Sequence, residues 1–309
     1  MSKLRFVRSS SHPPLSAPEG RVPLPRREFL KRSLQIAVLP ALASPWLISC
    51  GSDSTVAPTP RLESVNNFRD VAGADDSTAY RTMAGLKLRR GVIYRSCALS
   101  APSAADLATM EALGVRTIFD LRTPGEIKAN PDLPPAGASE TNVNLNGTPN
   151  VVHPPLATAG DAIAYMEISY ADFVTDSGVR GRIAEVLHSL AQTPGCHLYH
   201  CSGGKDRTGW ITNTLLNIVG VPQDVINQDY LLTNVYAQST IEGTYQQTAA
   251  AYGSGAADIT YPLLVADQRY LDAALDEVTV KYGTMASYVS DGLGLDAATR
   301  VRLSAMLLF

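Results

Sequence analysis

Residues 197–219 read HLYHCSGGKDRTGWITNTLLNIV, and this stretch decides the fold. In residues 197–201 the side chains alternate in the manner of a strand. Residues 208–219 carry apolar side chains at helical spacing and are followed by Gly220, a residue that commonly ends a helix. The loop of residues 201–207 contains two glycines, which allow the backbone to turn tightly. The sequence therefore predicts a strand, a tight loop and a helix in direct succession.

Strand and helix patterns also alternate elsewhere in the chain. Short strands are predicted at residues 91–96 and 115–121, with a helix at residues 103–113 between them. Residues 129–155 are rich in Pro, Asn and Gly and are predicted to be mostly loop. Helical patterns dominate the rest, at residues 163–190, 222–235 and, with a break near residues 253–255, onward to Leu308. This alternation predicts an α/β fold with a central, mostly parallel sheet flanked by helices and its chemistry at a strand-to-helix turn.

The composition is that of a globular protein and narrows the range of partners. The 309 residues are 45% hydrophobic and 18% charged. The formal net charge is −3, so no general basic field favours nucleic acid as a partner. An anionic substrate would therefore have to be held by a local site.

The loop after the predicted strand has the features of such an anion site. Gly203 and Gly204 allow successive backbone N–H groups to point inward, and the start of the following helix adds partial positive charge. The guanidinium of Arg207 can bind two phosphate oxygens and stabilise charge in a transition state. We therefore predict a phosphate cradle made by Ser202, Gly203, Gly204, Lys205, Asp206 and Arg207.

Cys201 begins this cradle, where the surrounding positive charge favours the thiolate at neutral pH. A thiolate can attack phosphorus and form a thiophosphoryl enzyme, which water then hydrolyses. We expect the Thr208 hydroxyl to hydrogen bond to the sulfur and the His200 imidazole to orient the loop. The residues indicate phosphomonoester hydrolysis, with Cys201 as nucleophile and Arg207 as phosphate clamp.

Other interpretations of the loop fit less well. In a Walker A loop Ser or Thr follows Gly-Lys, whereas here Asp206 does. Zinc is a second possibility, because four potential ligands stand close together: Cys196, His197, His200 and Cys201. These four crowd one strand and alternate between its faces, and no second pair stands at ligand spacing. A purely structural turn would not explain the charged cluster at residues 205–207. We therefore expect neither a metal nor a cofactor.

The run His-Cys-x-x-Gly-Lys-Asp-Arg-Thr-Gly resembles the signature of the bacterial atypical protein-tyrosine phosphatase family, which includes secreted mycobacterial and listerial enzymes. Further segments resemble the family's other motifs, namely NFRDVAG at residues 67–73, YRS and ALS at 94–96 and 98–100, FDLR with Glu126 at 119–126, DYLLTN at 229–234, and the region 282–294. This resemblance implies a protein-tyrosine-phosphatase-like α/β sandwich, formed as one domain by residues 62–309.

The resemblance also bears on the general acid and on the remaining cysteines. It implies that Asp206, inside the loop, is the acid, with Asp120 at the end of a predicted strand as the main competitor. The alternative role of Asp120 is to pair with Arg122 or Lys205. Cys97 stands where the family often has Gly, and either it or Cys196 could form a reversible disulfide with Cys201. An inert core thiol is the simpler interpretation of both.

Several substrates and functions remain open on the residues alone. Phosphotyrosine is our first choice, with dual specificity as an extension, and Tyr230 and Tyr236 are candidate walls for an aryl cleft. Lys205, as a second cation, would also suit a phosphoinositide or inositol phosphate. A rhodanese-like sulfurtransferase and a surface lipoprotein that binds phosphate without turnover are two further possibilities.

The N-terminal 50 residues have the pattern of an export signal. Residues 26–31 (RREFLK) resemble a twin-arginine motif, and an apolar run at residues 34–48 follows them. Residues 47–50 (LISC) resemble a lipobox, which implies lipidation of Cys50. The alternative is a basic tail followed by a buried helix. We predict a lipoprotein signal peptide at residues 1–50, a flexible tether at residues 51–61, and a membrane-anchored body that faces the periplasm or the cell exterior.

Overall fold

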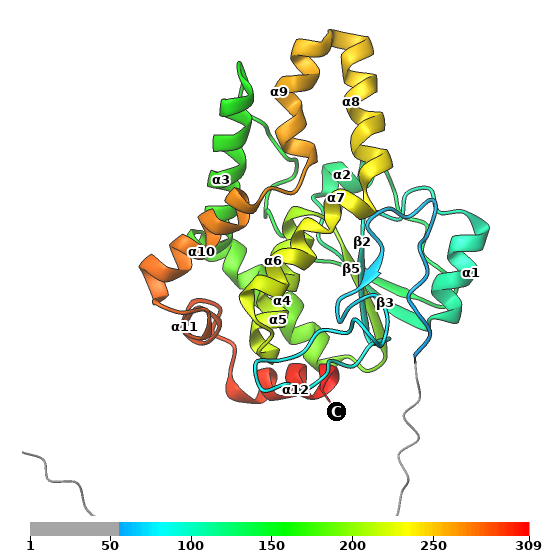
Figure 1. Ribbon diagram of the computed structural model, residues 1–309, viewed down its shortest axis with the longest axis vertical. Helices are drawn as coiled ribbons and strands as arrows, with labels where there is room; N and C mark the ends of the chain where they lie inside the picture. The colour runs from blue at the N-terminus through cyan, green and yellow to red at the C-terminus, as the bar shows by residue number, and fades with distance from the viewer. Residues whose placement is uncertain (1–55, 309) are drawn as a thin grey trace, which may run out of the picture. The chain divides into compact units, whose positions relative to one another are not determined.

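The computed structural model describes residues 56–308, drawn in colour in Figure 1. The predicted signal peptide, with Cys50, and the first part of the predicted tether lie outside the described residues. Among the described helices, none is both long and apolar enough to cross a membrane.

A five-stranded sheet runs through the described part of the chain, with the spatial order β1-β2-β5-β3-β4. The strands are β1 (Arg69–Asp70), β2 (Ile93–Ser96), β3 (Val115–Asp120), β4 (Ser139–Asn142) and β5 (Cys196–His200). β2, β5, β3 and β4 are parallel, and only β1 is antiparallel to its neighbour. The predicted α/β fold with a mostly parallel sheet is confirmed. β4, however, lies inside residues 129–155, for which the sequence pattern predicts mostly loop.

The register brings three strands to a common edge. Ser96 of β2 and Asp120 of β3 both pair with His200 of β5, so the three strands end side by side. Cys97, Leu121 and Cys201 each follow the end of one of these strands. The carboxyl edge of a parallel sheet is where binding sites assemble, because loops from several strands converge there. The loop predicted to carry the chemistry therefore leaves the sheet at this edge.

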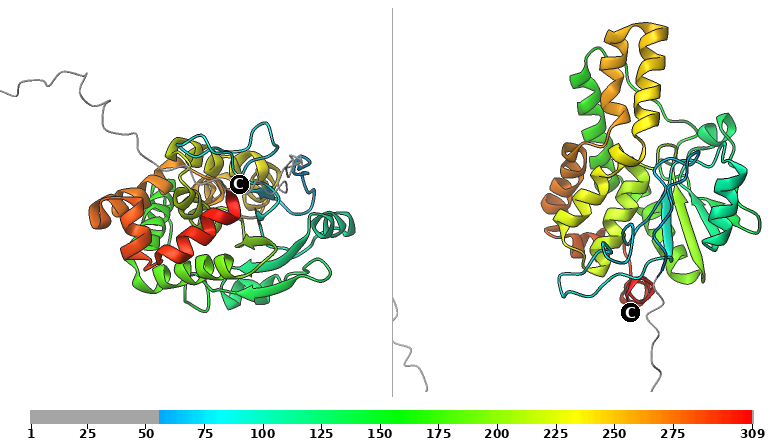
Figure 2. Two further views of the ribbon diagram at one scale, coloured as in Figure 1. Left: turned by 90° about the horizontal axis from the view of Figure 1, so that it is seen from below. Right: turned by 45° about the vertical axis from the view of Figure 1, so that its right-hand side comes forward.

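Helices cover both faces of the sheet, as Figure 2 shows in its right-hand view. α1 (Ala104–Ala112) lies on one face. On the other face are most of the helices that follow: α3 (Ala159–Thr175), α4 (Ser177–Gln192), α5 (Asp206–Val219), α6 (Gln223–Leu231), α7 (Thr233–Tyr236), α10 (Gln268–Tyr282), α11 (Met285–Ser287) and α12 (Ala297–Leu307). The chain also forms the short α2 (Pro124–Ala129) and a π-helical turn, η1 (Tyr288–Gly292).

Successive side chains of the central strands serve the two faces in turn. Leu198 of β5 packs into the cluster on the α1 side, whereas Tyr199 packs into the larger cluster on the other side. Ile118 and Phe119 of β3 divide in the same way. This period of two is the expected consequence of strand geometry, and it buries both faces of the sheet.

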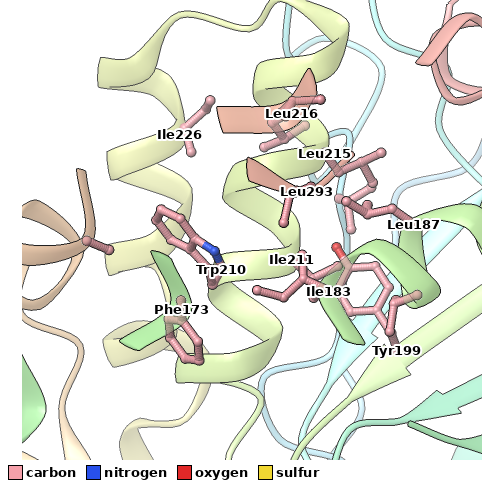
Figure 3. Packing of buried hydrophobic residues seen from close by; sticks show 14 of the residues in the cluster. Phe173, Ile183, Leu187, Tyr199, Trp210, Ile211, Leu215, Leu216, Ile226 and Leu293 are labelled. Atoms are coloured by element: carbon pink, nitrogen blue, oxygen red, sulfur yellow. The ribbon is translucent and has the colours of Figure 1, made fainter. Parts of the chain in front are cut away.

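α5 passes through the larger core, as Figure 3 shows. Trp210, Ile211, Leu215 and Leu216 of this helix are fully buried. The Trp210 ring stacks on Phe173 with centroids 6.0 Å apart, and its indole N–H donates to the Tyr288 hydroxyl. A helix fixed this firmly holds its own N-terminus, and the loop before it, in one position.

α8 (Gln238–Tyr252) and α9 (Ser254–Leu264) form a pair of adjacent helices, drawn at the top of Figure 1. Gly253 separates them with φ +90°, a value that L side chains rarely adopt. The predicted break near residues 253–255 is therefore confirmed. The far end of α9 leads to residues 263–266, which lie close to the loop after β5.

Residues 56–61, the last part of the predicted tether, lie against the folded body. The Arg90 guanidinium donates to the carbonyls of Val56 and Ala57 and to the Thr59 hydroxyl. The Arg61 guanidinium lies over the Tyr236 ring, 4.2 Å from its centroid. The described part of the predicted tether thus makes specific contacts with the folded body.

Candidate active site

The loop between β5 and α5 depends on a glycine for its shape. Gly204 has φ +66°, and a Cβ atom built on it would collide with the Ser96 carbonyl of β2. The Ala98 backbone N–H donates to the Ser202 carbonyl at 3.0 Å, which ties the loop to the segment after β2. The loop is therefore packed directly against the neighbouring strand, as a residue without a side chain at position 204 allows.

Two side chains donate hydrogen bonds to backbone carbonyl groups of this loop. Asn67 Nδ2 donates to Gly203 O at 3.2 Å and to Gly204 O at 2.8 Å. Arg95 Nη2 also donates to Gly204 O, at 2.8 Å. Where carbonyls point to one side of a loop, the backbone N–H groups point to the opposite side. This is the arrangement of an anion nest. The hydrogen bonds to the Gly203 and Gly204 carbonyls are thus compatible with the predicted phosphate cradle.

Asp229 fixes the arginines behind the loop. It is fully buried, and its two carboxylate oxygens bind Arg69 Nε at 3.1 Å and Arg95 Nη1 at 3.0 Å. The Tyr80 hydroxyl also donates to it, at 3.1 Å. Burial alone would raise the pKa of Asp229, but the charges of the two arginines outweigh burial and lower it. An ionised Asp229 therefore holds Arg95 in place against the loop.

Arg207 is held by Glu126 of α2. The two guanidinium nitrogens meet the two carboxylate oxygens at 2.6 and 2.8 Å, in a bidentate pair. The same carboxylate accepts from the Ser202 hydroxyl and from the Thr123 backbone N–H, so it also forms a capping box. Burial raises the pKa of Glu126, but the hydrogen bonds and charge of Arg207 dominate and lower it to about 2. This carboxylate therefore fixes the plane of the predicted phosphate clamp.

The contact between Glu126 and Arg207 has no signal in the sequence, where Glu126 stands only as part of a family motif. The local pattern is Thr-x-x-Glu from Thr123, which predicts a helix start and says nothing of Arg207. Asn67 and Asp229 likewise belong to motifs that do not reveal which atoms they contact.

Cys201 lies at the carboxyl end of β5 and is only 2% exposed. Burial lowers the pKa of the nearby Arg207, but its hydrogen bonds to Glu126 and its electrostatic interactions with Cys201, Glu126 and Asp206 outweigh burial and raise it. The His200 imidazole lies with Nδ1 3.2 Å from the Cys201 carbonyl, where it supports the loop. Thr208 Oγ1 is buried without a hydrogen-bond partner among the described residues. The structure thus brings the predicted nucleophile, the clamp and both supporting residues to one place.

The three cysteines that the structure describes, Cys97, Cys196 and Cys201, are free thiols. The alternative of a disulfide with Cys201 is therefore not formed among them. Cys196 begins β5 and Cys201 follows its end, so the length of the strand separates them. Burial raises the pKa of both Cys97 and Cys196 to about 12, which keeps them protonated. Both have the properties of inert thiols.

Asp206 begins α5, and its side chain is one-third exposed. Its Oδ1 accepts a hydrogen bond from the Tyr170 hydroxyl at 2.7 Å and lies 3.5 Å from Lys205 Nζ. Asp206 and Arg207 share the same cleft. A carboxyl group in this position can reach a substrate bound beside the clamp.

Lys205 is placed differently from the sequence-based expectation. Its ammonium group donates to the carbonyls of Leu263 and Val265 at 2.6 and 3.0 Å, and the side chain is almost fully buried. These two carbonyls lie at the end of α9, whose backbone needs donors there. The ammonium is thus used inside the protein, by these two carbonyls and by Asp206 Oδ1 at 3.5 Å. The expected second phosphate cation is not found in this position.

Asp120, the competing candidate for the acid, is fully buried beneath the site. Both of its oxygens bind the Arg122 guanidinium, at 2.9 and 3.0 Å. Arg122 also binds Asp132 at 2.6 Å, and His200 Nε2 lies 3.2 Å from the same carboxylate. Asp120 therefore takes its alternative role as a partner of Arg122. Sequence reasoning missed Asp132 altogether.

Asp120, Asp132 and His200 are also the described residues whose ligand atoms could meet around a metal ion. The Arg122 guanidinium already bridges both carboxylates and supplies a positive charge there. Burial raises the pKa of Asp132, but His200 and Arg122 outweigh burial and lower it. The group is a closed ion-pair network rather than an open ligand set.

A cleft of about 850 Å³ lies beside the start of α5. Glu126, Asp206 and Arg207 line one part of it. Its other walls come from α3, with Tyr165, Met166 and Phe173, and from residues 145–153. Tyr230 and Tyr236, the wall residues expected from the sequence, do not line it. Asp206 and Arg207, at the start of α5, thus line a partly apolar cleft, whereas Cys201 and residues 202–205 are not among its lining residues.

Comparison with known proteins agrees with this geometry. A protein of Cupriavidus necator named as a putative tyrosine-protein phosphatase is 32% identical over 251 residues, which cover 77% of this chain and 85% of that protein. The triple specificity protein phosphatase PtpB of Mycobacterium tuberculosis is 29% identical over 279 residues, covering 78% of this chain and 96% of PtpB. A tyrosine-protein phosphatase of Nostoc commune is 31% identical over 163 residues, about half of each chain.

The sequence pattern shared by the tyrosine phosphatase family matches residues 60–309 of this chain. This range contains the sheet, the loop from Cys201 to Arg207 and every side chain described above as contacting the loop. The chain therefore belongs to the tyrosine phosphatase family.

Proposed function

We propose that this phosphatase hydrolyses phosphotyrosine through a thiophosphoryl intermediate on Cys201, with Arg207 as the phosphate clamp and Asp206 as the general acid. One observation carries the proposal: the carbonyls of Gly203 and Gly204 are drawn backward by Asn67 and Arg95. The N–H groups of the loop are then free for phosphate oxygens directly beside the Cys201 sulfur. The start of α5 adds its partial positive charge to the same point.

The roles of the individual groups follow from this placement. The Cys201 sulfur attacks phosphorus, while the loop N–H groups and the Arg207 guanidinium bind the phosphate oxygens. Glu126 holds the guanidinium in the plane that bidentate binding requires. Asp206 gives a proton to the leaving oxygen and later takes one from the attacking water. The Thr208 hydroxyl is available to the sulfur as it becomes the leaving group.

Two features favour phosphotyrosine over phosphoinositides. The aromatic and apolar side chains of α3 that line the cleft suit an aryl ester. A substrate with several phosphates would need further cations, but the Lys205 ammonium is used by backbone carbonyls. PtpB is named as a triple specificity protein phosphatase, which supports testing more than one class of phosphorylated substrate with this chain. We rank phosphotyrosine peptides first and phosphoinositides second.

The test is hydrolysis of p-nitrophenyl phosphate without added metal, with vanadate and a thiol-alkylating reagent as inhibitors. Cys201→Ser should abolish turnover and leave substrate binding largely intact, because the cradle remains. Turnover near the wild-type level in this variant would contradict the proposal. A thiosulfate-to-cyanide assay separates a sulfurtransferase, and phosphate binding without turnover separates a non-enzymatic lipoprotein. A panel of phosphopeptides and phosphoinositides then ranks the substrates.

We further propose that residues 1–50 direct export and that Cys50 carries a lipid which anchors the body to a membrane. Support comes from the sequence alone: a paired-arginine motif at residues 26–31, an apolar run, and LISC at residues 47–50. An exported enzyme would act on substrates outside the cytoplasm.

A further inference from the structure

Asp206 is held from behind by two buried phenol groups. Tyr170 of α3 is fully buried, and its hydroxyl donates to Asp206 Oδ1 at 2.7 Å. The Tyr230 hydroxyl, buried on α6, lies 2.7 Å from the Tyr170 hydroxyl. The two hydroxyls, from α3 and α6, thus form a chain of hydrogen bonds that ends on the carboxyl group of Asp206.

The direction of this chain is fixed by the number of protons. The Tyr170 hydroxyl has a single proton, and it donates this proton to Asp206 Oδ1. Its oxygen therefore accepts the hydrogen bond from the Tyr230 hydroxyl. Burial, with the charge of Asp206, raises the pKa of both phenols well above the ordinary value, so both keep their protons. Asp206 Oδ1 is therefore an acceptor only.

The second oxygen of Asp206 has a different environment. Tyr170 and Lys205 both approach Oδ1, and no described side chain hydrogen bonds to Oδ2. When the carboxyl group is protonated, donors at Oδ1 drive the proton to Oδ2. The side chain is one-third exposed and lines the cleft beside Arg207. Oδ2 is thus the oxygen from which a substrate can receive a proton.

We propose that Tyr170 and Tyr230 are positioning residues for the general acid. By occupying Oδ1 they confine the transferable proton of Asp206 to Oδ2, on the cleft side. This arrangement suits phosphate esters with poor leaving groups, such as alkyl alcohols and unactivated phenols, whose departing oxygen must be protonated. The inference rests on the proposed function, because it requires Asp206 to be the acid.

The proton follows the bonds in both steps. As the Cys201 sulfur bonds to phosphorus and the ester P–O bond breaks, the Oδ2 proton moves to the leaving oxygen. In the second step water attacks phosphorus, the S–P bond breaks, and the carboxylate takes a proton from that water. Phosphate is released, and Cys201 returns as thiolate and Asp206 as acid.

The experiment compares kcat/KM of the full-length protein on p-nitrophenyl phosphate, which has a good leaving group, and on phenyl phosphate, which has a poor one. Asp206→Asn should lower the phenyl phosphate value by about 100-fold and the p-nitrophenyl phosphate value much less. Tyr170→Phe keeps the buried ring and should show the same asymmetry, with a roughly tenfold loss on phenyl phosphate. Tyr230→Phe should show a smaller loss in the same direction. Tyr230→Phe provides a second measurement of the same effect if Tyr170→Phe folds poorly.

Tyr270→Phe is the matched control. Its ring packs against Tyr170 in the same buried cluster, but its hydroxyl donates to the Pro262 carbonyl. It should leave the ratio of the two substrates unchanged. The double variant Tyr170→Phe with Asp206→Asn should be no slower on phenyl phosphate than Asp206→Asn alone, because the phenol acts through the carboxyl group.

Two results would overturn the inference alone: an equal loss on both substrates for both tyrosine variants, or additive losses in the double variant. Failure of the proposed function is a different result. If Asp206→Asn lowers kcat/KM equally on both substrates, Asp206 is not the general acid. The proposed positioning role of the two tyrosines is then excluded as well.

Discussion

Asn67 is, among the described residues, the one non-glycine whose backbone lies in the left-handed region, with φ 61°. Such a conformation is costly for most residues, although Asn tolerates it better than others. Here it directs the side-chain amide toward the carbonyls of Gly203 and Gly204, which are 136 and 137 residues after Asn67 in the sequence. The local strain is therefore coupled to the orientation of the phosphate-binding backbone.

Asn67→Ala should lower kcat/KM on p-nitrophenyl phosphate by about tenfold or more, because the Gly203 carbonyl loses its side-chain donor and the Gly204 carbonyl keeps only Arg95. Inhibition by vanadate should weaken in parallel, since the same N–H groups bind both anions. Asn66→Ala is the matched control, because the contact that the structure shows for Asn66 is made by its backbone carbonyl, with the Cys97 N–H. Equal effects of the two substitutions would rule out a specific role for the Asn67 amide.

Glu126 predicts a pH dependence of stability at the scale of one residue. Its pKa is lowered to about 2 by Arg207, below the ordinary 4.5. A carboxyl group whose pKa is lowered by folding stabilises the folded state at pH values above its pKa in the unfolded chain. This contribution is lost as the pH falls from 4.5 toward 2. The free energy of unfolding of Glu126→Gln should therefore lie furthest below wild type near neutral pH and approach it at about pH 2.

Urea unfolding at several pH values between about 2 and about 7 measures this difference. Glu185→Gln, which changes an exposed glutamate on α4, serves as the control and should run parallel to wild type. A gap between Glu126→Gln and wild type that stays constant with pH would contradict the ion-pair interpretation.

At the scale of elements, the strongly patterned segments could be predicted and the weak ones could not. α5 follows from the sequence because its apolar spacing and Gly220 are local signals, and its core position follows from them. β1 has only two residues and β4 reads SETN, so neither carries an apolar alternation. Such edge strands form because a neighbour offers unpaired hydrogen-bonding groups, and that neighbour is invisible in the local sequence.

Lys205 links two elements, the first turn of α5 and the end of α9. Lys205→Met should lower the free energy of unfolding by about 2 kcal/mol, because two carbonyls lose a charged donor. The KM for p-nitrophenyl phosphate should change little. Thermal unfolding and steady-state kinetics on the same sample measure both effects. A large rise in KM with unchanged stability would return Lys205 to the role of a phosphate cation.

At the scale of the whole chain, the folded body and the predicted export signal make separate predictions. If Cys50 is acylated, wild-type protein from bacteria grown with a labelled fatty acid should carry the label and partition with membranes. Cys50→Ala should lose both properties, whereas Cys97→Ala should retain them. Labelling of Cys50→Ala at the wild-type level would refute lipidation at this residue.

The sequence by itself determined where the loop and the helix after it lie, and it identified Cys201 and Arg207 as candidate site residues. All of these stand within a short stretch of adjacent residues, so their chemistry is local. It also determined the α/β class, since alternating strand and helix patterns leave few other layered arrangements. Only the tertiary structure decided that Glu126 holds Arg207, that Tyr170 holds Asp206, and that the Lys205 ammonium points to α9. Each of these pairings joins residues 36 to 81 positions apart. Their contacts depend on how the helices pack against the sheet, which no local pattern encodes.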